Sequence, residues 1–279
     1  MLEANKISVA LGGQQVVREV SFQVNRGENI AIIGPNGCGK STLLRCLIGA
    51  LRPEGGRILF EGQDVTAMSS KKRAKSMGLL PQEEAIPAMT TVFDYVCAGR
   101  YPYQSFFRGL NPSDVQAAKT SLQALEIDHL EQRVVERLSG GERQRVRLAT
   151  LLAQDPHVML LDEPMTGLDL CHQYLMLNII AELQSNSEKI MVSVMHDIDM
   201  SLRFFSRLLV MKDGEIVADG APREVLTDAL IQEVFGIRGQ IQTIQETSFP
   251  LFVCDPNQCR NHYTEDATCS FVVQKTTRD

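Results

Sequence analysis

A glycine-rich stretch that joins an apolar run to a helical pattern constrains this chain more than any other feature. Residues 29–33 form the apolar run, which predicts a buried β-strand, and residues 42–48 have the pattern of a helix. The stretch consists of Gly34, Pro35, Asn36, Gly37, Cys38, Gly39, Lys40, Ser41 and Thr42. Backbone N–H groups in such a loop, together with a helix N-terminus, surround the oxygens of a polyphosphate. The sequence therefore predicts an α/β fold that binds a nucleoside triphosphate.

Two side chains in this loop are predicted to bind the phosphates or Mg²⁺ directly. Lys40 can reach the terminal phosphates, and the hydroxyl of Ser41 can join water and phosphate oxygens around Mg²⁺. A chance match to a glycine-rich turn is the alternative interpretation. The strand and helix patterns on the two sides of the loop disfavour that alternative.

The composition excludes several classes of protein. Of the 279 residues, 44% are hydrophobic and 22% are charged, which is ordinary for a globular protein. No apolar stretch approaches the roughly 18 residues of a membrane-spanning helix, and the first residues lack the layout of a secretory signal. The net charge of −6 argues against nucleic acid as a partner. Seven scattered cysteines do not form a disulfide framework, so we expect a cytoplasmic protein.

Short apolar runs alternate with helical patterns along most of the chain. This alternation predicts a mainly parallel sheet, with an N-terminal antiparallel β portion and a helical insertion at about residues 84–153. Within the insertion, Ser113 is predicted to N-cap a helix. From about residue 237 the sequence becomes polar and weakly periodic. We therefore predict one domain over residues 1–236 and a cysteine-containing extension over residues 237–279.

Two acids end one of the predicted strands. Residues 158–161 are apolar, and Asp162 and Glu163 follow them. At the carboxyl end of a buried strand beside the phosphate loop, Asp162 could hold Mg²⁺ through water. Glu163 would project one step further and could polarise a water aimed at the γ-phosphate. Strands often end at an acid, and the functional interpretation rests on the nearby phosphate loop.

Polar side chains follow two other predicted strands. His196 comes after residues 189–194, and its imidazole could bind the γ-phosphate or hold the attacking water. Gln82 comes after residues 77–80, and its amide could ligate Mg²⁺ or water. The alternatives are a structural histidine and an ordinary loop glutamine.

A second glycine-rich helix start lies at residues 138–142. Ser139 and Glu142 have the spacing of a capping box. Gly140 and Gly141 need a further explanation, because glycine early in a helix is costly unless something approaches the backbone closely. Exposed N–H groups and the helix dipole would form a second anion site here. One chain then has two phosphate-binding helix starts and one loop lysine, which a second copy of the chain would bring together.

These motifs resemble, in order and spacing, those of the ATP-binding-cassette (ABC) ATPases, a branch of the P-loop NTPases. The resemblance covers about residues 3–236, and its motifs are Gly34–Thr42, Gln82, Leu138–Glu142, Leu160–Glu163, Gly167–Asp169 and His196. It implies ATP hydrolysis by a homodimer, in which Ser139, Gly140 and Gly141 of one subunit close over the ATP of the other. It also implies that Asp169 couples the two sites across the interface.

Finer features are similar to the ATPases of iron–siderophore, haem and cobalamin importers. They are Cys38 in the loop, residues 92–102 and residues 168–173. This similarity implies a peripheral protein on the cytoplasmic face of the inner or cell membrane. It implies membrane permease subunits as partners, with a substrate-binding protein as an indirect partner. We expect Gln82–Ala88 and Gly99–Tyr103 to contact the permease; for the latter, a simple kinked loop is the alternative.

The chain departs from the family pattern in two places. The aromatic residue that usually stacks on adenine is replaced by Leu11, with Val16 nearby, and weaker selection of ATP over GTP is expected. In the extension, four residues could bind Zn²⁺ or iron, although an inert packing role is favoured: Cys254, Cys259, His262 and Cys269.

Two other functions compete with an importer subunit. An ABC ATPase of the translation or DNA-repair type usually has tandem cassettes or a long coiled-coil insertion, which this sequence lacks. A P-loop kinase or switch GTPase does not need a second glycine-capped helix.

Overall fold

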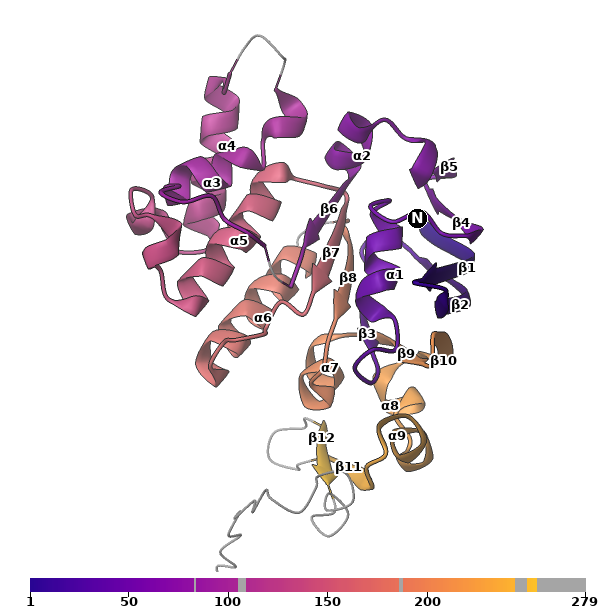
Figure 1. Cartoon of the computed structure of the whole chain (residues 1–279). Coiled ribbons are helices and arrows are strands. Elements are labelled where there is room, and N and C mark those ends of the chain that lie inside the picture. The colour runs from indigo at the N-terminus through magenta and orange to yellow at the C-terminus, as the bar shows by residue number, and fades with distance from the viewer. Residues whose placement is uncertain (83, 105–108, 186–187, 244–249, 255–279) are drawn as a thin grey trace, which may run out of the picture.

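The computed structural model describes residues 1–82, 84–104, 109–185, 188–243 and 250–254. A six-stranded sheet lies at the centre, with helices on one face and a second, four-stranded sheet beyond the other (Figure 1). Within these described ranges, no helix is long and apolar enough to cross a membrane.

The central sheet is mainly parallel, as predicted. Its strand order is β10-β9-β3-β8-β7-β6, and only β10 runs antiparallel to its neighbour. The strands are β3 (Asn29–Ile33), β6 (Met77–Leu80), β7 (Val158–Asp162), β8 (Ile190–Val194), β9 (Arg207–Lys212) and β10 (Glu215–Gly220). Every residue of β3, β7 and β8 is buried, because both faces of the sheet are covered. The carboxyl ends of the parallel strands meet at one edge, where the predicted polar residues follow them.

An antiparallel sheet covers one face of the central sheet. Its order is β2-β1-β4-β5, formed by β1 (Leu2–Leu11), β2 (Gln14–Val24), β4 (Gly55–Phe60) and β5 (Gln63–Asp64). Helix α1 (Lys40–Leu47) packs in the same core cluster, to which β3 contributes Ile30 and Ile32. Ala31 and Ile33 point to the other face and join a core cluster formed largely by helices. The alternation of side chains along β3 therefore separates the two cores.

The remaining helices fall into two groups. The predicted insertion contains α3 (Val92–Ala98), α4 (Pro112–Ala124) and nearly all of α5 (Gly140–Gln154), which pack on one another (Figure 1). The others are α2 (Ser70–Ser76), α6 (Leu170–Ser185), α7 (Ile198–Phe204), α8 (Pro222–Val225) and α9 (Asp228–Phe235), with short 3₁₀ turns at Val65–Ala67, Tyr101–Tyr103, Asp128–Leu130 and Val135–Arg137.

The N-cap of α4 differs from the prediction. Asn111, not Ser113, caps the helix: its side chain accepts from the N–H of Asp114, whose carboxylate accepts from the N–H of Asn111. Pro112 is then the first helical residue, where its missing N–H costs nothing. The prediction was wrong because it placed Pro112 outside the helix.

The extension is only partly within the described residues. Strands β11 (Gly239–Thr243) and β12 (Pro250–Cys254) form a hairpin that lies against α9 and α7 (Figure 1). Cys259, His262 and Cys269 lie outside the described residues. The predicted metal-binding role of these residues and the domain boundary at residue 236 remain predictions.

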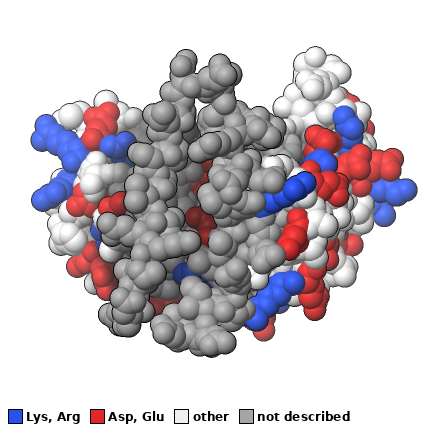
Figure 2. Space-filling view, turned by 90° about the horizontal axis from the view of Figure 1, so that it is seen from below, with Lys and Arg blue, Asp and Glu red and all other residues white. Residues whose placement is uncertain are grey.

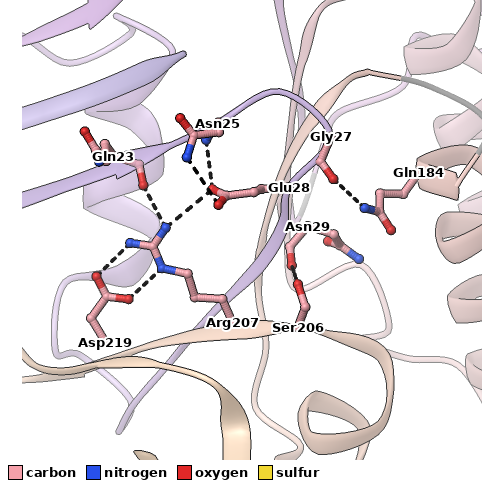
Figure 3. Close-up of polar contacts among 9 residues, drawn as sticks. All are labelled: Gln23, Asn25, Gly27, Glu28, Asn29, Gln184, Ser206, Arg207 and Asp219. Atoms are coloured by element: carbon pink, nitrogen blue, oxygen red, sulfur yellow. Dashed lines mark hydrogen bonds and ion pairs between the residues drawn. The ribbon is translucent and has the colours of Figure 1, made fainter.

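A polar cluster joins the two sheets at the opposite, amino-terminal edge of the core strands (Figure 3). The guanidinium of Arg207 donates to Asp219 at 2.6 and 2.8 Å, to the carbonyl of Gln23 at 2.9 Å and to Glu28 at 3.4 Å. The hydrogen-bonded Asp219 raises the pKa of Arg207. Arg207 is the first residue of β9, so this cluster joins β2, β9 and β10 at the edge of the sheet opposite the predicted site.

Candidate nucleotide site

The phosphate loop connects β3 to α1, and its glycines are required by close backbone contacts. Gly34 has φ +154°, and a Cβ atom there would lie 2.2 Å from the carbonyl oxygen of Met211. Gly39 has φ +104°, and its Cβ would lie 2.6 Å from the carbonyl oxygen of Val16. Gly39 is also the N-cap of α1. Because glycine has no side chain, no N-cap side chain accepts a hydrogen bond from the first N–H groups of the helix. This geometry suits a bound phosphate.

Lys40 is buried and bound to its own loop. Its Nζ donates to the carbonyl of Gly34 at 2.8 Å and to that of Pro35 at 2.9 Å. Burial lowers the pKa of the ammonium group. Both partners are neutral carbonyls, and a phosphate would be a stronger, charge-assisted acceptor for the same ammonium.

A cavity of about 140 Å³ lies over the loop. It is lined by Val16, Asn36, Gly37, Gly39, Lys40, Ser41, Thr42, Glu163 and His196. Leu11 is not among these residues and lies half exposed at the end of β1, whereas Val16 faces the cavity. Cys38 is buried beneath the loop, and burial raises the pKa of its thiol. The loop therefore offers its backbone and the polar residues Asn36, Lys40, Ser41 and Thr42 to a ligand, while the thiol of Cys38 is buried.

Asp162 and Ser41 meet at the end of β7. The Ser41 Oγ donates to Asp162 Oδ1 at 2.9 Å, and burial raises the pKa of this carboxyl. A hydroxyl and a carboxylate next to a phosphate loop form the oxygen-rich donor set that Mg²⁺ prefers.

Glu163 brings three of the predicted residues together. One carboxylate oxygen contacts Nε2 of His196, and the other accepts from Gln82 Nε2 at 2.7 Å. Thr166, which the sequence analysis did not single out, donates to the same oxygen at 3.1 Å. Glu163 has φ +50°, an uncommon left-handed conformation that aims its side chain into this cluster. The ends of β6, β7 and β8 thus place Gln82, Glu163 and His196 beside the phosphate loop.

The second glycine-rich helix start is well formed and does not line this cavity. Ser139 Oγ accepts from the N–H of Glu142 at 3.2 Å, and Glu142 accepts from the N–H of Ser139 at 2.9 Å, as a capping box requires. The backbone N–H of Ser139 lowers the pKa of Glu142. Ser139 and Gly140 are exposed, and neither they nor Gly141 line the cavity of their own chain.

Asp169 is exposed and lies beside this helix. It accepts from the N–H of His172 at 2.9 Å, which lowers the pKa of its carboxyl. The ring of His172 packs on Gly141, where a Cβ atom would lie 2.6 Å from it. The loop of Asp169 and the start of α5 therefore form one surface.

Comparison with known proteins places the chain in a family. The ABC transporter family profile matches residues 17–166. The chain belongs to the ABC transporter ATP-binding family. Relatives include the ferric enterobactin transport ATP-binding protein FepC of Escherichia coli (38% identical, 90% of this chain and 93% of that one) and the probable siderophore transport system ATP-binding protein YusV of Bacillus subtilis (37%, 92% and 92%).

Solved structures agree with this assignment. A putative metal-chelate type ABC transporter in an inward-facing conformation superposes with a TM-score of 0.80 at 28% identity, over 91% of this chain and 96% of that one. The ADP conformation of the cassette MJ1267 superposes with a TM-score of 0.75 at 27% identity, over 84% and 98%. The predicted fold, ATP binding and ATPase activity are confirmed, and the kinase and GTPase alternative is excluded.

Proposed function

We propose that this chain is the ATP-hydrolysing subunit of an importer for an iron–siderophore, haem or cobalamin-type substrate. The names of its relatives support iron chelates and haem most directly, since they include a siderophore system, ferric enterobactin, hydroxamate and hemin importers. The observation that carries the proposal is the convergence of Gln82, Glu163 and His196 beside the phosphate loop.

The site residues have distinct proposed roles in hydrolysis. Lys40 and the loop N–H groups bind the phosphates, and Glu163 orients and polarises the attacking water. His196 holds the γ-phosphate or that water. Mg²⁺ would neutralise phosphate charge, held by Ser41, Asp162 and the amide oxygen of Gln82.

The helix start at Ser139 is proposed to act on a second copy of the chain. Its exposed N–H groups lie outside the cavity of their own chain, so an ATP bound by the phosphate loop reaches them only in a pair. Asp169 lies on the same exposed surface and would link the two sites.

The permease contact is proposed at a groove behind Gln82. A cavity of about 760 Å³ there is lined by Gln82, Glu84, Ala85, Ile86, Glu136, Arg143 and Arg147. Within the insertion, Tyr101 is 67% exposed and free to contact a partner. Tyr103 is instead held between Arg100 and Lys75, whose charged groups lie 3.8 and 4.8 Å from its ring centre. We therefore assign the contact in this loop to Tyr101.

The charge distribution supports a protein partner rather than nucleic acid. On the face that bears the ends of the core strands, basic and acidic side chains are interspersed among the described residues on both flanks (Figure 2). The described part of this face shows no broad basic area of the kind that binds a phosphate backbone.

Membrane association tests the importer proposal. We expect the chain to be recovered with the membrane fraction, on its cytoplasmic face, when the permease subunits of its importer are co-expressed. Alone, it should remain in the supernatant. Fractionation followed by immunoblotting measures both, and the same distribution with and without the permease would favour a non-transport ABC ATPase.

Nucleotide competition tests the consequence of Leu11 and Val16. An aliphatic side chain offers the base apolar contact without the extra energy of aromatic stacking, about 0.5–1.5 kcal/mol. We expect the GTP concentration that displaces bound ATP to lie within about tenfold of the concentration of unlabelled ATP that does so. Val16→Tyr should increase the difference between these two concentrations. A strong preference for ATP in the unaltered chain would contradict this expectation.

A further inference from the structure

A buried arginine on α5 holds the loop that follows β6. Arg147 is 9% exposed. One terminal nitrogen donates to the carbonyl of Pro81 at 2.6 Å, and the other donates to the carbonyl of Gln82 at 3.2 Å. The planar fork of a guanidinium presents two N–H donors in a fixed geometry to these two adjacent carbonyls. The backbone of Gln82 is therefore fastened to the helix that begins at Ser139.

The same arginine is connected to the loop of Glu163. Arg147 donates to Gln144 Oε1 at 3.0 Å, and Gln144 Nε2 donates to the carbonyl of Pro164 at 2.8 Å. Pro164 directly follows Glu163, whose carboxylate accepts from the Gln82 amide at 2.7 Å. These contacts close a ring that runs from the end of β6 through α5 to the end of β7 and back.

The far side of the Gln82 loop is also held by helices. Glu84 lies 3.9 Å from Nε of Arg147 and accepts from the hydroxyl of Tyr95 at 2.6 Å. Tyr95 belongs to α3, which packs on α5. Residues on both sides of Gln82 are thus tied to helices, while the Gln82 side chain reaches across to Glu163.

The C-terminal half of α5 is closely packed against β6 and Gly99, the C-cap of α3. A Cβ atom on Gly78 of β6 would lie 2.3 Å from Leu151, and one on Gly99 would lie 2.3 Å from the carbonyl oxygen of Thr150. A helix rises about 1.5 Å per residue, so Arg147 lies about 6 Å along the axis from Leu151 and Ser139 about 18 Å from it. A tilt of α5 about this packed end moves Ser139 most and carries Arg147 with it.

We propose that Arg147, supported by Gln144, is a positioning residue that sets the place of the Gln82 amide relative to Glu163 according to the position of α5. Contact of Ser139 with the ATP of a second copy thereby changes the bond between Gln82 and Glu163 within its own chain. The inference rests on the proposed roles of Gln82 and Glu163, and it assigns to Arg147 no contact with ATP.

A double-mutant cycle of Arg147 and Gln82 tests this inference on the full chain. In Arg147→Met, which keeps an unbranched apolar stem and removes the guanidinium, we expect kcat for ATP hydrolysis to fall about tenfold while KM changes less than about twofold. In a Gln82→Ala background the same substitution should lower kcat by less than about twofold, because Arg147 acts through Gln82. Arg147→Lys, which keeps one charged donor, should retain an intermediate rate.

Two comparisons separate positioning from a general loss of structure. Arg145→Ala removes another arginine of α5, one that donates to the carbonyl of Leu125, and should leave kcat within about twofold. If Arg147→Met only damages folding, it should lower kcat by the same factor in the unaltered and the Gln82→Ala backgrounds. That additive result would overturn this inference and leave the proposed function intact. Unchanged hydrolysis in both Glu163→Gln and Gln82→Ala would overturn the proposed site and this inference with it.

Discussion

Replacing Glu163 by glutamine should lower the ATP turnover rate by about two to four orders of magnitude, the usual contribution of a general base. The amide has nearly the same shape as the carboxylate but cannot accept the proton of an attacking water. ATP binding depends instead on the loop N–H groups and Lys40, so the Kd for ATP should change less than about twofold. Steady-state phosphate release and equilibrium ATP binding measure the two quantities.

The same variant should accumulate the closed pair of chains. If hydrolysis is the step that allows the pair to separate, a chain that binds ATP and does not cleave it stays paired. Gel filtration with ATP should show a dimer for Glu163→Gln and a monomer without nucleotide. Glu233→Gln, which alters an exposed acid that contacts Lys212, is the matched control and should behave as the unaltered chain. Normal turnover in Glu163→Gln would contradict the assignment of the base.

Replacing Ser139 by arginine should abolish hydrolysis while ATP still binds to each chain. Ser139 is exposed at the start of α5, so a long side chain there is accommodated in one chain but blocks the approach of a second. Loss of the N–H donors that reach the ATP of the partner should cost at least about a hundredfold in rate. The Kd for ATP of the isolated chain should stay within about twofold.

A smaller substitution controls for the lost helix cap. Ser139→Ala also removes the bond to the N–H of Glu142, which costs about 1 kcal/mol of stability, without adding bulk. It should retain much more activity than Ser139→Arg. The pairing itself is tested by dilution: the rate per chain should fall as the unaltered protein is diluted. A rate that stays proportional to protein concentration at high dilution would contradict hydrolysis in a pair.

One sequence prediction failed where two neighbouring residues competed for one role. Ser113 and Asn111 are both good N-caps, and only the helical conformation of Pro112 decides for Asn111. Leu11 and Val16 lie on paired strands close to the turn between them, and the register of β1 and β2 decides that Val16 lines the cavity. For the N-cap, the pattern indicated the segment correctly but not the residue, whereas a contact of Leu11 with the base remains a prediction.

The sequence by itself determined the phosphate loop, the mainly parallel sheet and the polar residues at the strand ends. These features are local, because a glycine turn, an apolar strand and the residue after it are neighbours in the chain. Only the tertiary structure decided which side chains meet: Gln82 with Glu163, and Arg147 with the carbonyl of Pro81. Such pairs are far apart in the chain, and a buried arginine on a helix has the same sequence pattern as an exposed one. Its role depends on the packing of α5 against β6, which no local pattern encodes.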